Sequence, residues 1–318
     1  MTEAWRPGES DERPRRPASG PVKVRVPAKI NLHLSVGPLR ADGYHELSTV
    51  YHAIALYDEL TARHGDTLTL TMEGEGAGEL ALDATNLAVR AARALAAHAG
   101  VQAHARLHLR KQIPLAAGLA GGSADAAAAL VACDALWGTG LTRDELAEVA
   151  GRVGSDVPFL VHGGTALGTG RGEAVSPVLV RPNSWHWVLA VAAGGLATPA
   201  VYQELDRLRA VGAAPPPVGT ADGLLTALRR REPSALAGVL VNDLQPAALS
   251  LRPELSATLR AGEEAGALAG LVSGSGPTCV FLVKDAGRAG ELAKALEDSG
   301  TCRAAWPVHG PVHGARVL

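Results

Sequence analysis

The stretch Pro114-Leu-Ala-Ala-Gly118-Leu-Ala-Gly121-Gly122-Ser123 decides the fold, because it leads straight into the alanine-rich segment Ala124-Asp-Ala-Ala-Ala-Ala-Leu130. Alanine has the highest helix propensity, so this segment predicts a helix that begins at a glycine-rich turn. We expect Ser123 to be its N-cap and Asp125 to lie in its first turn, where a carboxylate interacts favourably with the helix dipole. Such a turn exposes backbone N–H groups, which is the arrangement of an anion-binding site.

This glycine-rich loop matches neither of the two familiar nucleotide fingerprints. No lysine follows its glycines, so it is not a GxxxxGK[ST] loop, and no GxGxxG pattern follows a strand. On the loop alone, a phosphate site and a flexible turn before a packed helix are equally supported.

Composition indicates a globular protein and excludes several classes. Of the 318 residues, 47% are hydrophobic and only 3% aromatic, so the chain can bury a large core built from Ala, Val and Leu, and global disorder is excluded. The net charge of −2 disfavours nucleic acid as a partner. Cys133, Cys279 and Cys302 are scattered and odd in number, which is typical of a reducing cytosol, and no Cys/His spacing predicts a metal site.

The N-terminus and the hydropathy pattern predict a cytoplasmic protein. Residues 1–20 contain Pro, Arg, Asp and Glu but lack the apolar segment of a signal peptide, so we expect a flexible tail. No apolar stretch is long enough to span a bilayer, so no membrane is expected as a partner.

Two α/β units are predicted after this tail, and together they make an α+β protein. The first comprises residues 21–183, where two strands, 22–26 and 31–36, are joined at Lys29. The Asp42-Gly43 pair after them predicts a turn. Further on, Thr142 and Glu145 have the spacing of a capping box at the start of a helix.

The second unit follows a turn-like break at 181–184 and comprises residues 184–318. It reads as one strand, helices over 224–231, 233–241 and 253–265, two strands, a helix and a strand. That order predicts a ferredoxin-like split βαβ domain.

Three further segments have a bland and a chemical interpretation. Lys29 is either a solvated lysine or a functional cation, and Ser273–Thr278 is either a plain hairpin turn or part of a site. Asp156 precedes Val157-Pro158, and in isolation a helix cap is favoured for it. A phosphate loop, a lysine and a carboxylate are, however, the parts that phosphoryl transfer needs. The carboxylate accepts the proton of the attacking hydroxyl, and the lysine keeps it ionised and offsets developing charge.

The order of these motifs resembles the GHMP kinase superfamily, which the loop Pro114–Ser123 and the turn Ser273–Thr278 match. The resemblance implies the two-domain GHMP kinase architecture, with an N-terminal nucleotide-binding domain. Within the superfamily, four segments are similar to the family that phosphorylates 4-diphosphocytidyl-2-C-methyl-D-erythritol: Pro27–Leu32, Arg40–His45, Gly154–Pro158 and Asn242–Leu244. The similarity covers nearly all of residues 21–318.

Carried over by position, the resemblance implies a role for each matching residue. Lys29 and Asp156 would be the catalytic pair, with Asp156 taking the proton from the 2-hydroxyl of the substrate. Tyr44 and His45 would recognise cytosine, with Tyr202 as the opposite aromatic face. The implied ATP site comprises Asn86 at the adenine and the loop residues Pro114, Leu115, Ala116, Ala117, Gly118, Leu119, Ala120, Gly121, Gly122, Ser123 and Ala124. The implied substrate site comprises Asn31, Tyr44, His45, Thr198, Tyr202, Gly274, Ser275 and Gly276.

The loop departs from the family pattern at two positions. Ala120 stands where the family often has a third successive glycine, so we expect this position not to need a positive φ. Ala124 replaces a frequent second hydroxyl and leaves Ser123 as the only loop hydroxyl. We therefore expect ATP and water, rather than acidic side chains, to hold Mg²⁺.

The resemblance thus implies an ATP- and Mg²⁺-dependent kinase that makes the 2-phosphate of a cytidine-diphospho sugar alcohol in non-mevalonate isoprenoid synthesis. The partner would be a small-molecule substrate, and the chain a monomer or weak homodimer. Alternatives are a superfamily kinase for homoserine, mevalonate or a sugar, a non-catalytic nucleotide sensor, and a structural or RNA-binding module. Tyr44, His45 and Tyr202 favour the cytidyl substrate over the other acceptors, while Lys29 and Asp156 disfavour a sensor.

Overall fold

The computed structural model describes residues 16–179 and 183–318. Most of the predicted flexible tail, residues 1–15, and the predicted break at Arg181-Pro182 lie outside the described residues. At the start of the described part, Ala18 donates to Ala135 O at 3.2 Å, and its carbonyl accepts from His64 Nε2 at 2.9 Å. The boundary between residues 183 and 184 stays a prediction.

The described chain forms a first, mainly antiparallel sheet of eight strands around one long hairpin. The hairpin consists of β1 (Val22–Leu39) and β2 (His45–Arg63), and the order along the sheet is β12-β1-β2-β4-β3. The other strands are β3 (Thr69–Gly74), β4 (Arg106–Lys111), β5 (Thr165–Thr169), β6 (Ala174–Pro177), β8 (Val241–Asn242) and β12 (Arg316–Val317).

The hairpin differs from the expected pair of short strands. The prediction of a break around Lys29 is wrong, because β1 stays extended through it and pairs with β2 almost along its whole length. The register shifts between Pro27 and Ala28, where a bulge accommodates a residue that has no N–H to donate. The long strand β2 is absent from the sequence-based prediction. The 40–44 turn contains the Asp-Gly pair expected there.

Four helices follow in the first half: α1 (Leu87–Ala99), α2 (Gly121–Trp137), α3 (Arg143–Gly151) and α4 (Val157–His162). The alanine-rich α2 is buried on almost every side and contacts both β1 and β2, because its small side chains let the helix lie close to the sheet. The predicted capping box of Thr142 and Glu145 at the start of α3 is confirmed.

The second sheet has four antiparallel strands in the order β11-β7-β10-β9, which is the predicted split βαβ arrangement. They are β7 (Trp185–Val191), β9 (Ala269–Val272), β10 (Cys279–Val283) and β11 (Ala304–Gly310). The helices of this half are α5 (Thr198–Ala210), α6 (Asp222–Arg230), α7 (Pro233–Ala237), α8 (Gln245–Leu251), α9 (Leu255–Glu264) and α10 (Ala286–Asp298).

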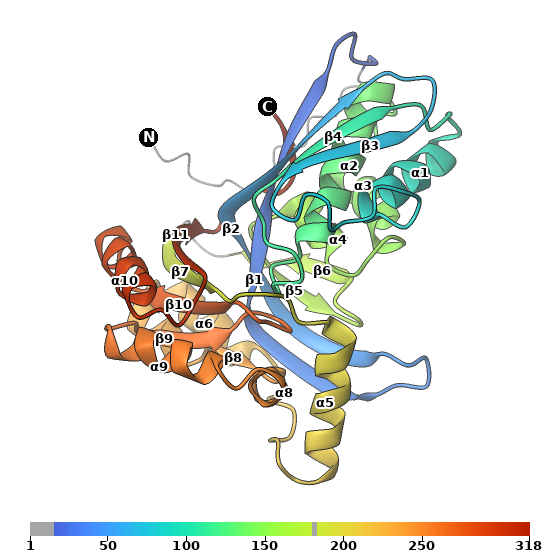
Figure 1. Ribbon diagram of the computed structural model, residues 1–318. Coiled ribbons are helices and arrows are strands. Elements are labelled where there is room, and N and C mark those ends of the chain that lie inside the picture. Colours follow the sequence, from blue (N-terminus) through green and yellow to red (C-terminus); the bar gives the residue numbers. More distant parts are fainter. Residues whose placement is uncertain (1–15, 180–182) are drawn as a thin grey trace.

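Two of these helices, α5 and α8, were not predicted, and a third is shorter than expected. The helix predicted over 233–241 ends at Ala237, because Val241 pairs with His33 of β1 instead. Figure 1 shows α5 beside the β1–β2 hairpin, and its buried residues belong to the same core cluster as Val188 and Ala190 of β7.

The two halves share a core through β10. Its alternate residues Cys279, Phe281 and Val283 pack with α9 and α10, whereas Val280 and Leu282 belong to the core that contains α2 and the first sheet. The second sheet is therefore buried on both faces, which holds the turn before β10 against the first half. Within the described ranges, every helix is too short or too polar to cross a membrane.

Two helical glycines test this packing. An added Cβ at Gly262 of α9 would lie 2.1 Å from Phe281 Cε1, whereas one at Gly290 of α10 would meet nothing within 4 Å. We expect Gly262→Ala to lower the free energy of unfolding by about 1–3 kcal/mol through overpacking. Gly290→Ala should raise it by about 0.5–1 kcal/mol through helix propensity. Urea unfolding of both variants checks this, and equal effects would contradict the packing.

Candidate active site

One cavity of about 770 Å³ lies between the glycine-rich loop, the β1–β2 hairpin and α5. Of the residues predicted from the sequence, it brings together the catalytic pair, most of the loop and most of the substrate set. These are Lys29, Asn31, Tyr44, His45, Ala116, Ala117, Gly118, Ala120, Gly121, Gly122, Ser123, Asp156, Thr198, Tyr202, Gly274 and Ser275. Six predicted residues do not line it: Asn86, Pro114, Leu115, Leu119, Ala124 and Gly276.

These six lie around the cavity rather than in its wall. Pro114 and Leu115 line a neighbouring hollow of about 230 Å³. Leu119 and Ala124 are buried. Asn86 is the N-cap of α1, where its side chain accepts from Ala88 N and donates to Ala81 O. The next residue, Leu87, does line the cavity.

In the glycine-rich loop before α2, three alternate residues have a positive φ. Ala116, Gly118 and Ala120 have φ of 47°, 75° and 57°. The expectation that position 120 avoids a positive φ is therefore wrong. Ala120 is the residue that turns the chain into the helix, and this left-handed conformation costs about 1–2 kcal/mol for a residue with a Cβ.

Position 118 requires a glycine because the backbone of the turn at Ser273, in the second half of the chain, lies directly against it. A Cβ there would lie 2.0 Å from Ser273 O, and the Ser273 hydroxyl donates to Gly118 O at 3.1 Å. The turn between β9 and β10 thus touches the loop directly, and the two motifs identified in the sequence form one structural unit.

The start of α2 also differs from the prediction. The helix begins at Gly121, so Ser123 lies inside its first turn and is not the N-cap. Asp125 lies beyond the first turn and is buried, and it does not interact with the exposed helix end. Its partner is Lys111, the last residue of β4, at 2.8 Å.

Lys111 is the centre of a buried ionic cluster, which we call the Lys111 cluster and which comprises Asp58, Lys111 and Asp125. Lys111 Nζ donates to Asp58 at 2.6 Å as well as to Asp125. The other Asp58 oxygen accepts from the N–H groups of Gln112 and Ile113, at the start of the loop. Sequence reasoning missed this cluster. The available signal was a lysine and an aspartate flanking the loop, Lys111 before it and Asp125 after it.

The catalytic pair predicted from the sequence meets inside the cavity. Lys29 Nζ lies 3.7 Å from Asp156 Oδ2 and donates to Asn31 Oδ1 at 2.7 Å. The Asn31 amide donates in turn to Thr49 Oγ1 at 2.8 Å, so the lysine is held by a chain of hydrogen bonds along the sheet. Lys29 is 5% exposed, which excludes the solvated-lysine interpretation.

Asp156 stands directly before α4 but does not act as a side-chain cap. Its carboxylate makes no capping hydrogen bond and instead accepts from the Tyr51 hydroxyl at 2.9 Å. Burial and the adjacent carboxylate hold the pKa of Tyr51 well above its usual value, so the hydroxyl keeps its proton and donates it. The helix-cap interpretation favoured in isolation is wrong. Tyr51, on the unpredicted strand β2, is a site residue that the sequence did not reveal.

The far end of the cavity is aromatic and carries one acid. The His45 ring lies 5.3 Å from the Tyr202 ring, and its Nε2 lies 3.4 Å from Asp206. His45 Nδ1 lies 2.9 Å from Gly37 O; because a carbonyl oxygen only accepts, Nδ1 carries the proton. Tyr44 is exposed, with the Arg171 guanidinium 4.9 Å from its ring centre.

The fold and the arrangement of this site match the architecture expected for a GHMP kinase, and comparison with known proteins leads to the same class. The family model of the GHMP kinases N terminal domain matches residues 86–164, and that of the GHMP kinases C terminal matches residues 224–302. The chain is a member of the GHMP kinase superfamily.

Its place within the superfamily follows from sequence identity. A 4-diphosphocytidyl-2-C-methyl-D-erythritol kinase from Salinispora tropica is 74% identical over the full length of both chains. The chain therefore belongs to the family of 4-diphosphocytidyl-2-C-methyl-D-erythritol kinases. A crystal structure of 4-(cytidine 5'-diphospho)-2C-methyl-D-erythritol kinase is 33% identical, with a TM-score of 0.71 over 90% of this chain and 98% of that one. A homoserine kinase from Cytophaga hutchinsonii, 21% identical over 95% of this chain and 99% of that one, shares the fold with a TM-score of 0.76.

The Lys111 cluster predicts a pH dependence of stability. Burial raises the pKa of Asp125 from 3.8 to about 8. Between the unfolded and the folded pKa, folded Asp125 keeps a proton that the unfolded chain has lost, so the free energy of unfolding falls as pH rises through this range and levels off above the folded pKa. Asp125→Asn should remove this contribution.

Urea unfolding at a series of pH values measures it. The stability of Asp125→Asn relative to the parent should increase up to about pH 8 and then stay constant, whereas exposed Asp66→Asn serves as the control. A difference that does not vary with pH would contradict the raised pKa.

Proposed function

We propose that this protein transfers the γ-phosphoryl group of ATP to the 2-hydroxyl of 4-diphosphocytidyl-2-C-methyl-D-erythritol, giving the 2-phosphate, in the non-mevalonate synthesis of isoprenoid precursors. The observation that carries the proposal is the meeting of Asp156, Lys29 and Tyr51 in one cavity whose far end holds His45 and Tyr202. Its 74% identity to a relative of that name supports the choice of substrate.

Asp156 is the general base in this proposal. The Tyr51 hydroxyl occupies Oδ1, so Oδ2, which lies toward Lys29, is the oxygen that takes the proton of the substrate hydroxyl. The freed oxygen forms a bond to the γ-phosphorus while the bond from this phosphorus to the β–γ bridging oxygen breaks, and ADP leaves. Lys29 places a positive charge beside the base and the transferred group.

The loop and the start of α2 bind the phosphates of ATP. Gly121, Gly122 and Ser123 form the first turn of α2 and line the cavity, so their free N–H groups and the helix dipole favour an anion there. Gly122 is exposed, which lets a phosphate oxygen approach the backbone without meeting a side chain.

Mg²⁺ would accompany ATP and neutralise charge on the phosphate oxygens. In the described part of the chain, no group of three or more His, Cys, Asp or Glu side chains could hold a metal ion. Ser123 and Asp156 each offer the cavity a side-chain oxygen, the donor type that Mg²⁺ prefers. The ATP phosphates and water would therefore supply most of its ligands.

The far end of the cavity suits a flat, polar base. Tyr202 and the Tyr44–His45 pair provide aromatic faces, and His45 Nε2 and the Asp206 carboxylate beside it provide polar atoms. Homoserine and mevalonate have no ring to fill this end. We further place the protein in the cytoplasm as a monomer or weak homodimer, with residues 21–183 and 184–318 as its domains.

Replacement of the base tests the mechanism. We expect Asp156→Asn to lower kcat about a hundredfold or more, because the amide cannot take the proton. The variant should unfold at a urea concentration near that of the parent. Lys29→Ala should lower kcat more than it weakens ATP binding, and exposed Asp66→Asn should leave kcat unchanged. Turnover near the parental rate in Asp156→Asn would rule out this base.

Release of ADP by the purified protein with ATP and Mg²⁺ tests the substrate. The cytidyl compound, homoserine, mevalonate and galactose are compared side by side, and only the first should be phosphorylated. Tyr202→Ala should raise KM for it about tenfold, whereas Tyr202→Phe, which retains the stacking ring, should not. Preference for another acceptor would discard the cytidyl substrate, and absence of turnover with measurable ATP binding would favour a sensor.

A further inference from the structure

Helix α5 forms one wall of the cavity and turns a single face toward it. Thr198, Tyr202, Asp206 and Arg209 are spaced by four, four and three residues, which places them on one side of a helix. Thr198 hydrogen-bonds with Ser275 at 2.9 Å, and Tyr202 and Asp206 both approach His45. The fourth member of this face, Arg209, does not line the cavity but fixes the end of the wall.

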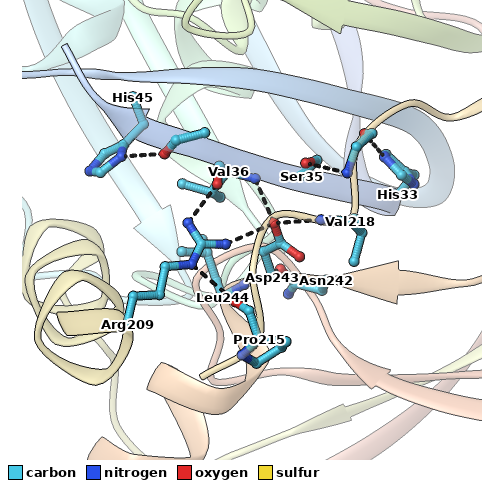
Figure 2. A network of polar contacts seen from close by, with 12 residues as sticks. His33, Ser35, Val36, His45, Arg209, Pro215, Val218, Asn242, Asp243 and Leu244 are labelled. Atoms are coloured by element: carbon cyan, nitrogen blue, oxygen red, sulfur yellow. Dashed lines mark hydrogen bonds and ion pairs between the residues drawn. The ribbon is translucent and has the colours of Figure 1, made fainter. Parts of the chain in front are cut away.

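Arg209 joins α5 to three other segments of the chain. Its Nη2 donates to Asp243 Oδ2 at 3.0 Å, its Nη1 to Val36 O at 2.6 Å and its Nε to Pro215 O at 3.2 Å, so all three nitrogens of the guanidinium have partners (Figure 2). The Asp243 side chain is only 1% exposed. The same oxygen of Asp243 accepts from Val36 N at 2.8 Å.

The ion pair therefore hydrogen-bonds with both backbone polar groups of Val36: Arg209 donates to its carbonyl, and Asp243 accepts from its N–H. The next residue, Gly37, is the one whose carbonyl accepts the hydrogen bond of His45 Nδ1. The pair is thus connected to His45 through Val36 and Gly37, two consecutive residues of β1. It is connected to Tyr202 and Asp206 through less than two turns of rigid helix.

We propose that the Arg209–Asp243 pair is a positioning pair that sets the separation between Tyr202 and His45, and thereby the selectivity of the cavity for the cytidyl group. The inference rests on the proposed function, because that function places the base against the aromatic faces of Tyr202 and His45. Neither residue of the pair lines the cavity, so both act through the residues they hold. The glycine-rich loop and Asp156 have no bond to the pair, so ATP binding and the chemical step should not depend on it.

The guanidinium is needed for its geometry as well as its charge. A lysine retains the charge but cannot reach Asp243, Val36 and Pro215 from one planar group. Loss of one partner also leaves the other charge buried and unpaired. Arg209→Lys and Asp243→Asn therefore test the positioning without truncating either side chain.

The chain offers a matched control on the same helix. Arg207 pairs with Glu204 on the exposed side of α5, and two nitrogens of its guanidinium, Nε and Nη2, donate to the two carboxylate oxygens of Glu204. Arg207→Lys makes the same chemical change with no link to β1. In both Arg209→Lys and Asp243→Asn we expect KM for the cytidyl substrate to rise roughly tenfold, with KM for ATP and kcat within about twofold of the parent. Arg207→Lys should match the parent.

The double variant Arg209→Lys/Asp243→Asn separates positioning from general damage. Its rise in KM should be smaller than the product of the two single effects, because both changes break the same pair. Parental KM values in both single variants, or an equal rise in KM for ATP, would overturn the inference while the proposed function stands. Absence of turnover of the cytidyl substrate by the unaltered protein would instead overturn the proposed function, and the inference with it.

Discussion

The buried charge of Lys111 is the interaction on which the glycine-rich loop depends. A buried cation must have hydrogen-bond partners in place of solvent, and Asp58 on β2 and Asp125 on α2 both accept from Lys111 Nζ. Asp58 also binds the two N–H groups at the start of the loop, so one cluster fixes both the strand end before the loop and the helix after it. With both ends of the loop fixed, the backbone at Ala116, Gly118 and Ala120 is held in the left-handed region. The direction of the N–H groups at the start of α2 follows from this arrangement.

The β1–β2 hairpin carries both ends of the site. Asn31 and Tyr51 are paired across the two strands, and they hold Lys29 and Asp156 respectively. Further along the same hairpin, His45 begins β2 and is held by Gly37. Strand pairing therefore fixes the Lys29–Asp156 end of the cavity relative to its aromatic end, whereas the wall opposite, α5, belongs to the second half of the chain.

Local sequence signals predicted the parts of this fold that local interactions determine. The Thr142 capping box, the Asp-Gly turn and the alanine-rich helix are such parts, and the order of strands and helices in the second half was confirmed. The start of α2 at Gly121 and the buried position of Asp125 depend on Lys111, which is remote in sequence, so helix rules placed Ser123 and Asp125 wrongly. The position of Tyr51 and the pairing of Arg209 with Asp243 were not predicted, for the same reason. Motif order brought Lys29 and Asp156 together correctly, although spacing alone favoured a helix cap for Asp156.

The edge of β1 opposite β2 is covered by three separate pieces of chain. β12 pairs with Val24 and Arg25, Leu119 O accepts from Lys29 N, and β8 pairs with His33 and Leu34. During synthesis on the ribosome, the hairpin emerges long before β8 and β12 do. Its unpaired N–H and C=O groups are thus open to other chains until the last strand arrives. Such long-range pairing also slows folding, which lengthens the time for which this edge is exposed.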